Sequence, residues 1–218
     1  MKVSIVLTFI LSSTFFISNA LAQSESSAKS ILDNASKVYS SYNTIMADFT
    51  LRGENKQENS DFNGKGRVYL VPGSGKFKIE MADHAIISDG KTQWNVMLGL
   101  GEAQITNVDP NNKSINPSNI FDFYTSGYKM SKLGEVKVGT NVLSIIELIP
   151  TDKTQNVSKI QLRINNSSGF IYDASVFDKN GNKYTYSLAN IEVNKTFSPG
   201  IFGFYKHNYP DIEIVDLR

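Results

Sequence analysis

The sequence predicts a mainly β protein with helices, an α+β fold whose antiparallel sheet curls toward a barrel. The first observation is a period-two pattern. Phe77, Ile79 and Met81 alternate with charged residues, which places apolar side chains on one face of a strand. The second is that strand-like segments follow one another without intervening helices. The third is a helical stripe before the strands, whose apolar side must be buried against the sheet.

The N-terminus has the pattern of a cleavable export signal. Lys2 is followed by an apolar run from Val3 to Ile17 and then by Ala20-Leu21-Ala22, and the run is short for a membrane span. We expect residues 1–22 to be a signal peptide and residues 23–218 to form a single domain that is soluble after export. An uncleaved N-terminal anchor is the alternative interpretation.

The composition of the expected mature chain argues against several classes of partner. Removal of the signal takes away one basic residue, Lys2, and leaves 21 basic and 21 acidic residues. A formal charge of zero argues against nucleic acid or an anionic membrane surface as the partner. The chain has no cysteine, which excludes disulfides, thiolate metal sites and acylation on Cys.

The segment from Ser24 has helical spacing. Apolar residues recur every three or four positions and predict one stripe of a helix of about five turns, with Ser24 near its cap. The stripe consists of Ala28, Ile31, Leu32, Ala35, Val38, Tyr39 and Tyr42. Ordinary core packing explains this stripe, and a helix that also closes a cavity is the functional alternative.

Strands follow this helix. The expected pieces are a strand at Ile45–Leu51, a polar hairpin loop at Glu54–Asp61, a meander at Phe62–Leu98 and a strand at Ala103–Val108. Within the meander, Pro72-Gly73-Ser74-Gly75 and Asp89-Gly90 are turn signals, because both favour backbone conformations that tight turns require.

The middle of the chain interrupts the strands. Residues 110–119 are rich in Asn, Pro and Ser, and Asn116-Pro117 has the pattern of a helix start. The residues that then fall on one helical face are Ile120, Phe121, Tyr124 and Tyr128. The sequence predicts a short aromatic helix, which either plugs the mouth of the barrel or acts as a movable lid.

Strands resume after Gly134. The expected strands are Val136–Val138, Val142–Pro150, Ser158–Ile164, Phe170–Phe177 and Lys183–Leu188, the last extended by Ile191 and Val193, and turn-forming clusters separate them. The tail carries Phe202, Phe204, Tyr205 and Tyr209 before a final alternating segment. We expect these aromatic residues to close the core at the seam of the barrel.

The sequence shows little catalytic chemistry. His84 and His207 are the only histidines, and their spacing does not suggest a metal pair. No Gly-x-Ser-x-Gly motif is present, and Gly64-Lys65-Gly66 lies on a strand, so it is not a dinucleotide fingerprint. An apolar ligand in a sheet-lined cavity is the better prediction, because the mouths of such barrels commonly hold apolar ligands.

The ordered motifs of the meander resemble those of a known family. They are Gly64-Lys65-Gly66, Pro72, Phe77–Met81 and Ser88-Asp89-Gly90-Lys91-Thr92-Gln93-Trp94, preceded by Ala47-Asp48-Phe49-Thr50 and followed by a last strand ending at Ile212–Asp216. In this order they resemble the periplasmic outer-membrane lipoprotein carrier (LolA) family from about Ala28 onward. The resemblance implies an open, incomplete antiparallel β-barrel covered by the N-terminal helix and a short mid-chain helical lid.

The resemblance also implies a function. Members of this family take acylated lipoproteins from an inner-membrane ABC-type lipoprotein-releasing complex and hand them to an outer-membrane acceptor. We therefore expect a monomeric, non-enzymatic carrier without a cofactor in the periplasm of a Gram-negative-type bacterium. The expected acyl-chain-binding residues are Phe49, Phe77, Met81, Trp94, Ile120, Phe121 and Tyr124.

Two positions carry more detailed expectations. Phe77 matches the family's cavity-edge phenylalanine, so Phe77→Glu is expected to impair delivery and leave the fold intact. In well-known members an arginine just before the matching proline ties the lid shut, whereas this chain has Val71 there. Arg52 or Arg67 could take over that role.

Two alternative functions use the same residues. One is a sensor that binds a lipid or lipoprotein and regulates an envelope-stress partner, and the other is a carrier of another lipid, such as a glycolipid or pigment. A stable complex with a regulatory protein and no cargo transfer would favour the sensor. A hydrolase would need a clustered nucleophile and base, which the sequence does not display.

Overall fold

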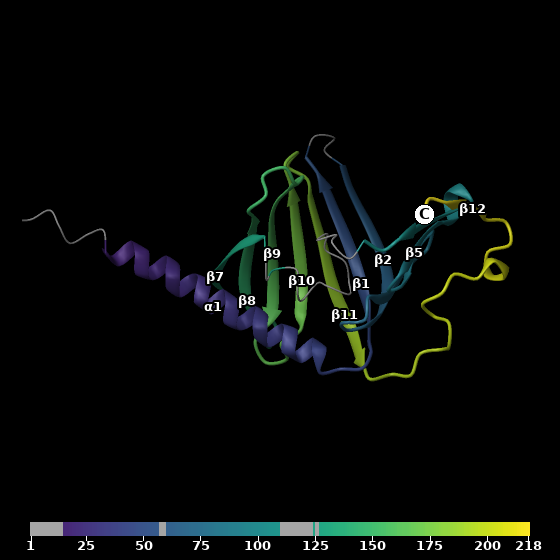
Figure 1. The fold of residues 1–218 in the computed structure, drawn as a ribbon. Helices are drawn as coiled ribbons and strands as arrows, with labels where there is room; N and C mark the ends of the chain where they lie inside the picture. The colour runs from purple at the N-terminus through teal and green to yellow at the C-terminus, as the bar shows by residue number, and fades with distance from the viewer. Residues whose placement is uncertain (1–14, 57–59, 110–123, 125–126) are drawn as a thin grey trace, which may run out of the picture.

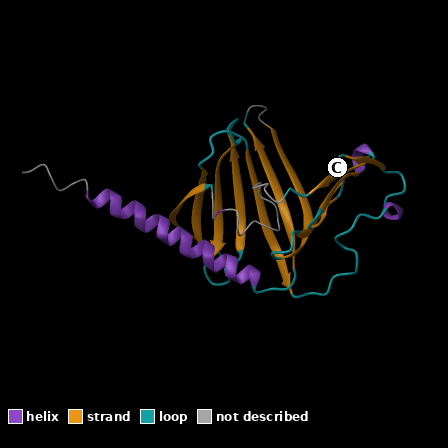
Figure 2. Ribbon diagram, viewed as in Figure 1, coloured by secondary structure: helices purple, strands orange, loops and turns teal. Residues whose placement is uncertain are grey.

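A computed structural model describes residues 15–56, 60–109, 124 and 127–218, and side chains from residue 23 onward. Within these residues, one long helix lies against one face of a 12-stranded sheet (Figure 1). The sheet is open and curved, with strands in the order β12-β6-β5-β4-β3-β2-β1-β11-β10-β9-β8-β7 (Figure 2). The prediction of an open antiparallel sheet covered by an N-terminal helix is confirmed, and the sheet does not close into a barrel.

The helix α1 (Phe15–Ser40) is longer than its apolar stripe predicts. It begins within the expected signal peptide, so Ser24 lies inside the helix and is not its cap. The Ser24 hydroxyl donates instead to the backbone carbonyl of Lys132, at 3.0 Å. The helix ends at Ser40, whose side chain donates back to the Ser36 carbonyl at 2.7 Å.

The strands form two antiparallel meanders joined through the β1–β11 pair. The first meander contains β1 (Ile45–Asn55), β2 (Ser60–Val71), β3 (Lys76–Met81), β4 (His84–Asp89), β5 (Thr92–Met97) and β6 (Glu102–Asn107). The second contains β7 (Tyr128–Val138), β8 (Asn141–Pro150), β9 (Val157–Asn165), β10 (Ile171–Asp178) and β11 (Lys183–Val193). The last strand, β12 (Glu213–Asp216), pairs in parallel with β6.

The predicted turns of the first meander are present. Gly73, Gly75 and Gly90 have φ values of 69°, 74° and 92°, which residues with a side chain rarely adopt. The Asp89 carboxylate accepts hydrogen bonds from the backbone amides of Lys91 and Thr92, at 2.8 and 2.7 Å. These bonds fix the β4–β5 hairpin and with it the register of both strands.

Two boundaries differ from the sequence prediction. Both ends of the segment expected to be a polar loop, Glu54–Asp61, continue the β1–β2 ladder, with Glu54 paired to Asp61 and Asn55 to Ser60. Arg52 also contacts Asp61, at 3.1 Å. Tyr128, expected on the mid-chain helix, begins β7. The rest of that expected helical lid, including Ile120 and Phe121, lies outside the described residues, except Tyr124.

Register defines two faces of the sheet, because directly paired residues point to the same side. The helix face, which α1 covers, holds the two larger core clusters. In one, Leu32 and Ala35 of α1 pack on Ile146, Leu148 and Leu162 of the second meander. The other comprises Tyr39 of α1 with Ile45, Ala47, Val68, Leu70 and Phe77 of the first meander.

At β4 the apolar core moves from the face that α1 covers to the opposite face of the sheet. Ala85, Val96 and Ala103 pair with one another and face away from α1, on what we call the outer face. The C-terminal segment covers them, with Ile212 in the same buried cluster and Tyr209 packed against it. This segment, yellow in Figure 1, runs from the end of β11 back across the molecule to place β12 beside β6.

Candidate functional site

The structure brings together three of the predicted acyl-binding residues on the sheet. Phe49 of β1, Phe77 of β3 and Met81 of β3 lie on the helix face, as the pairing of β1 with β2 and of β2 with β3 shows. Trp94 of β5 is not among them. It pairs with Ile87 on the outer face and packs under the C-terminal segment, because the apolar side of the sheet has changed over.

Phe77 lies in the core and not at a rim. Its side chain is 4% exposed and belongs to the cluster that contains Tyr39 of α1 and Leu70 of β2. We therefore now expect Phe77→Glu to destabilise the fold, because an unpaired carboxylate at this depth is costly to bury. Phe77 supports the helix face from within, and the more accessible apolar residues lie farther along the strands.

Glycines on the helix face make room for large side chains there. A Cβ atom on Gly66 would overlap the backbone carbonyl of Glu80 and lie 2.8 Å from the Phe49 ring. A Cβ on Gly64 would lie 3.0 Å from the terminal methyl group of Met81. On this face of β2 the Phe49 and Met81 side chains therefore pack directly against the backbone of the two glycines.

A third glycine, Gly53 of β1, repeats this arrangement. Its missing side chain is replaced by the ring of Phe62, which lies across Gly53. The Phe62 ring then approaches that of Tyr184 on β11, with 6.1 Å between the ring centroids. The aromatic surface thus continues from β2 over β1 to β11.

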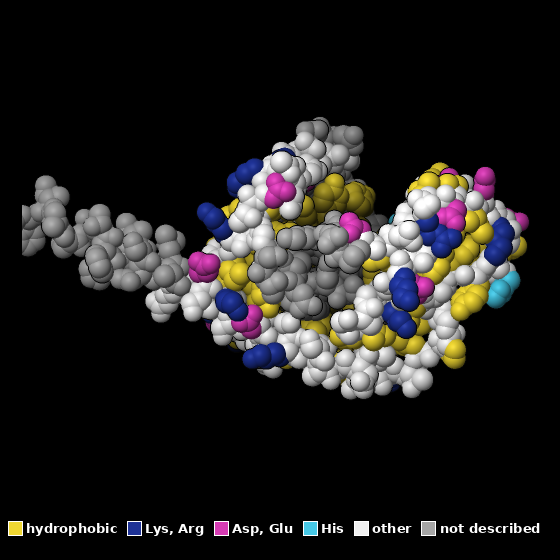
Figure 3. Space-filling model, viewed as in Figure 1, with side chains coloured by type: hydrophobic (Ala, Val, Ile, Leu, Met, Phe, Trp, Pro, Cys, Tyr) yellow, Lys and Arg dark blue, Asp and Glu magenta, His cyan; other side chains and the backbone are white. Residues whose placement is uncertain are grey.

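These contacts define an apolar patch on the helix face of β1, β2, β3 and β11. We use this name for Phe49, Leu51, Phe62, Met81, Tyr184 and Tyr186, none of which belongs to the buried core clusters. Phe62 is 47% exposed and Tyr186 is 40% exposed. Figure 3 shows hydrophobic side chains gathered in a hollow of the face on which α1 lies. Phe49 is 8% exposed and forms the buried end of the patch. Exposed apolar patches commonly mark binding surfaces.

Sequence reasoning missed Phe62, Tyr184 and Tyr186 as members of this site. Phe62 stands at the start of the meander, and the two tyrosines lie more than a hundred residues later in the chain. The alternation of side chains between the two faces of β11 could have placed them on the helix face. Tyr186 pairs with Leu51, and Tyr184 with Gly53, only if β1 and β11 are neighbours.

Two hollows on the described surface are lined mostly by polar residues. One, of about 640 Å³, is lined by Thr50, Leu51, Arg52, Glu54, Asn63, Gly64, Lys65, Lys183, Thr185 and Ser187. The other, of about 300 Å³, lies between α1 and the ends of β7, β8 and β9. Of the apolar patch, only Leu51 borders either of these two hollows.

Tyr124 connects the mid-chain segment to α1. Its side chain is 3% exposed, packs in the cluster of Leu32 and Ala35, and donates a hydrogen bond to the Asp33 carboxylate at 3.1 Å. Asp33 also contacts Lys29 at 2.6 Å. The hydrogen bond from Lys29, followed by that from Tyr124, holds the pKa of Asp33 below its usual value. Tyr124 therefore lies on the helix face but within the buried core, and its role in acyl-chain binding stays a prediction.

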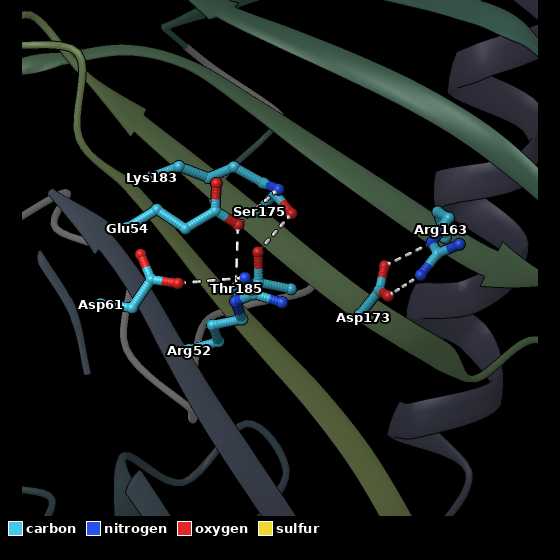
Figure 4. Close-up of polar contacts among 8 residues, drawn as sticks. All are labelled: Arg52, Glu54, Asp61, Arg163, Asp173, Ser175, Lys183 and Thr185. Atoms are coloured by element: carbon cyan, nitrogen blue, oxygen red, sulfur yellow. Dashed lines mark hydrogen bonds and ion pairs between the residues drawn. The ribbon is translucent and has the colours of Figure 1, made fainter. Parts of the chain in front are cut away.

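The outer face of β1, β2, β9, β10 and β11 is polar and carries several ion pairs. Figure 4 views this face with α1 behind the sheet and shows Lys183 beside Glu54, 3.2 Å apart, and Arg163 beside Asp173. Arg67 contacts Asp48 at 2.7 Å, and this bond lowers the pKa of Asp48. Arg52 and Arg67 both lie on this outer face, opposite α1. Whether either binds the expected lid stays a prediction, because all of that segment except Tyr124 lies outside the described residues.

The part of the chain that the structure describes contains no candidate metal site and no candidate membrane-spanning helix. No group of three or more His, Asp or Glu side chains there is arranged to hold a metal ion. None of the helices in the same ranges combines the length and the apolar character that a membrane span requires.

An open curved sheet with one helix on its apolar face defines the LolA-like class of fold. A family model described as outer membrane lipoprotein carrier protein LolA matches residues 40–205. The match extends over more than half of the chain, so this protein belongs to that family. The prediction made from the ordered motifs of the meander is thereby confirmed.

One solved structure shows the same fold, and two others are more distantly similar. An uncharacterized conserved protein from Thermus thermophilus has a TM-score of 0.60 at 15% identity, over 87% of this chain and 99% of that one. A LolA superfamily protein from Nitrosomonas europaea has a TM-score of 0.45 at 14% identity, over 81% and 97%. The MucA/MucB complex of Pseudomonas aeruginosa has a TM-score of 0.46 at 14% identity, over 79% and 59%. The sequence matches no curated protein.

Proposed function

We propose that this protein is a periplasmic, non-enzymatic carrier that binds the acyl chains of lipoproteins on the helix face of its sheet. In this role it takes cargo from an inner-membrane ABC-type releasing complex and delivers it, as a monomer, to an outer-membrane acceptor. The observation that supports the proposal is the apolar patch of β1, β2, β3 and β11, which lies outside the core clusters and includes half-exposed aromatic residues. Membership of the LolA family supports the class of cargo.

The energetics of acyl chains explain why such a surface is useful. Each methylene removed from water contributes about 0.8 kcal/mol, so an acylated protein does not leave a membrane for water unaided. A carrier must return most of that free energy on delivery. A patch that is open and partly exposed before binding meets this requirement better than a sealed cavity, because it leaves the chains accessible to an acceptor.

The primary test is native mass spectrometry of the mature protein. The protein is purified from the periplasm without detergent and incubated with membranes that contain triacylated lipoproteins. A one-to-one adduct with a lipoprotein is the expected result. An adduct with a smaller lipid would point instead to a carrier of another lipid, and a stable complex with a regulatory protein but no adduct would point to a sensor.

A pair of neighbouring residues on β1 tests the face that binds. Leu51 points to the helix face within the apolar patch, whereas Thr50 is exposed on the outer face. We expect Leu51→Glu to weaken binding of a fluorescent acyl probe at least tenfold, because the carboxylate is placed against the chains. Thr50→Glu adds the same charge on the opposite face and should bind like the unmodified protein. Equal affinities of the two variants would contradict the assignment, provided both give the same circular dichroism spectrum.

A further inference from the structure

The helix face changes its chemistry where the sheet passes from β3 to β5. On β3 it presents Phe77, Ile79 and Met81, but the register continues from Ile79 through Ile86 to Asn95 and then to Gln104. The same face of β5 and β6 carries five half-buried polar residues, Gln93, Asn95, Glu102, Gln104 and Thr106. We call these five residues the amide surface. It adjoins the apolar patch through β3 and β4.

The amide surface has hydrogen-bonding groups but no cation. Register places nine side chains on the helix face of β4, β5 and β6, namely His84, Ile86, Ser88, Gln93, Asn95, Met97, Glu102, Gln104 and Thr106. None is Lys or Arg, and Glu102 is acidic. The Gln104 amide donates to the Glu102 carboxylate at 2.8 Å, and His84 contacts the side-chain oxygen of Asn95. An anionic phosphate would find no positively charged partner here.

The outer face of the same strands shows why this surface can be polar. Val96 and Ala103, which alternate with the amide residues, are fully buried on the outer face. The C-terminal segment covers them with Ile212 and Tyr209. Because the core of this region lies on the outer side, its helix face does not have to be apolar and is free to contact a ligand.

We propose that the amide surface binds the polypeptide that follows the acylated residue of the cargo, while the acyl chains lie on the apolar patch. This inference rests on the proposed carrier function and adds a second subsite to it. Side-chain amides both donate and accept hydrogen bonds, so they match the N–H and C=O groups of an extended peptide. The lack of cations favours a neutral peptide over a phospholipid headgroup.

The dimensions of a sheet indicate how much peptide is held. Neighbouring strands lie about 4.8 Å apart, so the path from β3 to β6 is about 14 Å. An extended chain advances about 3.3 Å per residue, which makes this path about four residues long. The subsite therefore accommodates the first four residues after the acylated one.

The affinity test compares two ligands on three proteins. One ligand is a triacylated cysteine ester, and the other is the same triacylated cysteine followed by four neutral residues. The proteins are the unmodified chain, the double variant Asn95→Ala with Gln104→Ala, and the control Asn107→Ala. Asn107 is an exposed residue of β6 that pairs with Thr92 on the outer face.

We expect the unmodified protein to bind the peptide-bearing ligand at least fivefold more tightly than the ester. The double variant should lose this preference and keep its affinity for the ester, whereas the control should keep both. Equal binding of the two ligands by the unmodified protein would overturn the peptide subsite and leave the carrier function standing. Binding of neither ligand would overturn the carrier function as well. A preference for phosphatidylglycerol that the double variant abolishes would overturn the peptide in favour of a headgroup.

Crosslinking provides a measurement that does not depend on affinity. Because the chain has no cysteine, Gln104→Cys and Asn107→Cys each create a single reactive thiol. A triacylated peptide with a thiol-reactive group on the third residue after the acylated one should label the first variant and not the second. Equal labelling of both variants would contradict the proposal.

Discussion

At the scale of single residues, the helix face depends on what is absent. Because Gly66 has no side chain, the Phe49 ring can lie over β2. A Cβ atom on Gly66 would overlap the backbone carbonyl oxygen of Glu80 on β3. We expect Gly66→Ala to lower the free energy of unfolding by about 1–3 kcal/mol, because the added methyl group meets backbone that cannot move aside. Urea denaturation measures the difference. Gly99→Ala is the control, since a Cβ there meets nothing within 4 Å, and a similar loss in both variants would contradict the explanation by contact.

Phe77 and Phe62 provide a second comparison at this scale. Phe77 is 4% exposed and Phe62 is 47% exposed, although both lie on the helix face. We expect Phe77→Ala to lower the free energy of unfolding by about 3–5 kcal/mol, as for other buried aromatic residues. Phe62→Ala should cost clearly less stability and should instead weaken the binding of acyl chains. Thermal denaturation and probe titration of the two variants separate these effects, and a reversed ranking in stability would contradict the assignment of Phe77 to the core.

At the scale of elements, β5 provides a direct test of which face binds lipid. Trp94 is the only tryptophan of the chain and lies under the C-terminal segment on the outer face. We expect a brominated fatty acid that binds the protein to leave Trp94 fluorescence nearly unchanged. Strong quenching, which falls off steeply with distance, would return Trp94 to the acyl-binding residues. Ile212→Ala, which opens the cover of the outer face, should shift Trp94 emission to longer wavelength.

Most strands were predictable because each carries its own period-two pattern and its own turns. The Asp89-Gly90 hairpin is one example, since its side-chain and backbone requirements are both local. The polar ends of β1 and β2 were not predictable, because their pairing depends on contacts such as Arg52 with Asp61 across the ladder. The parallel partner of β12 was not predictable either, since nothing local to Glu213–Asp216 specifies β6.

The candidate site was only partly predictable for the same reason. Phe49, Phe77 and Met81 lie within one meander of consecutive strands. The face of the sheet on which each lies could therefore be followed from strand to strand along the chain. Ala85, Ile86 and Ile87 are consecutive apolar residues, so β4 has two apolar faces and the parity of Trp94 relative to the core cannot be decided from sequence. Tyr184 and Tyr186 join the site only through the β1–β11 pair, which connects distant parts of the chain.

At the scale of the whole molecule, paired charges set the pH dependence of stability. Hydrogen bonds from Arg67 and Arg218 lower the pKa values of Asp48 and Asp216, that of Asp216 to about 2. Because the folded values lie below the unfolded value of about 3.9, this stabilisation is present above about pH 4 and is lost as the pH falls through the folded values. At the alkaline end, burial raises the pKa of Tyr39, so stability is lost above about pH 10.

We therefore expect a thermal midpoint that is flat near neutral pH and declines below about pH 4. Arg67→Gln should make the acid decline shallower, since the pKa of Asp48 then returns toward its unfolded value. Differential scanning calorimetry from about pH 2 to pH 8 measures both curves. Parallel curves for the unmodified protein and the variant would show that the Asp48–Arg67 pair, which is at the surface, contributes nothing measurable.

An open sheet also has two free edges, and their construction bears on self-association. An exposed edge strand can pair with another chain, and natural sheets prevent this with lysines, bulges and short strands. The edge strand β7 carries Lys129, Lys132 and Lys137, and its ladder is interrupted between Lys132 and Gly134, where Leu133 is the extra residue. The opposite edge, β12, has only four residues. These features disfavour edge-to-edge polymerisation into fibrils, even though the sheet is unclosed and carries a broad apolar surface.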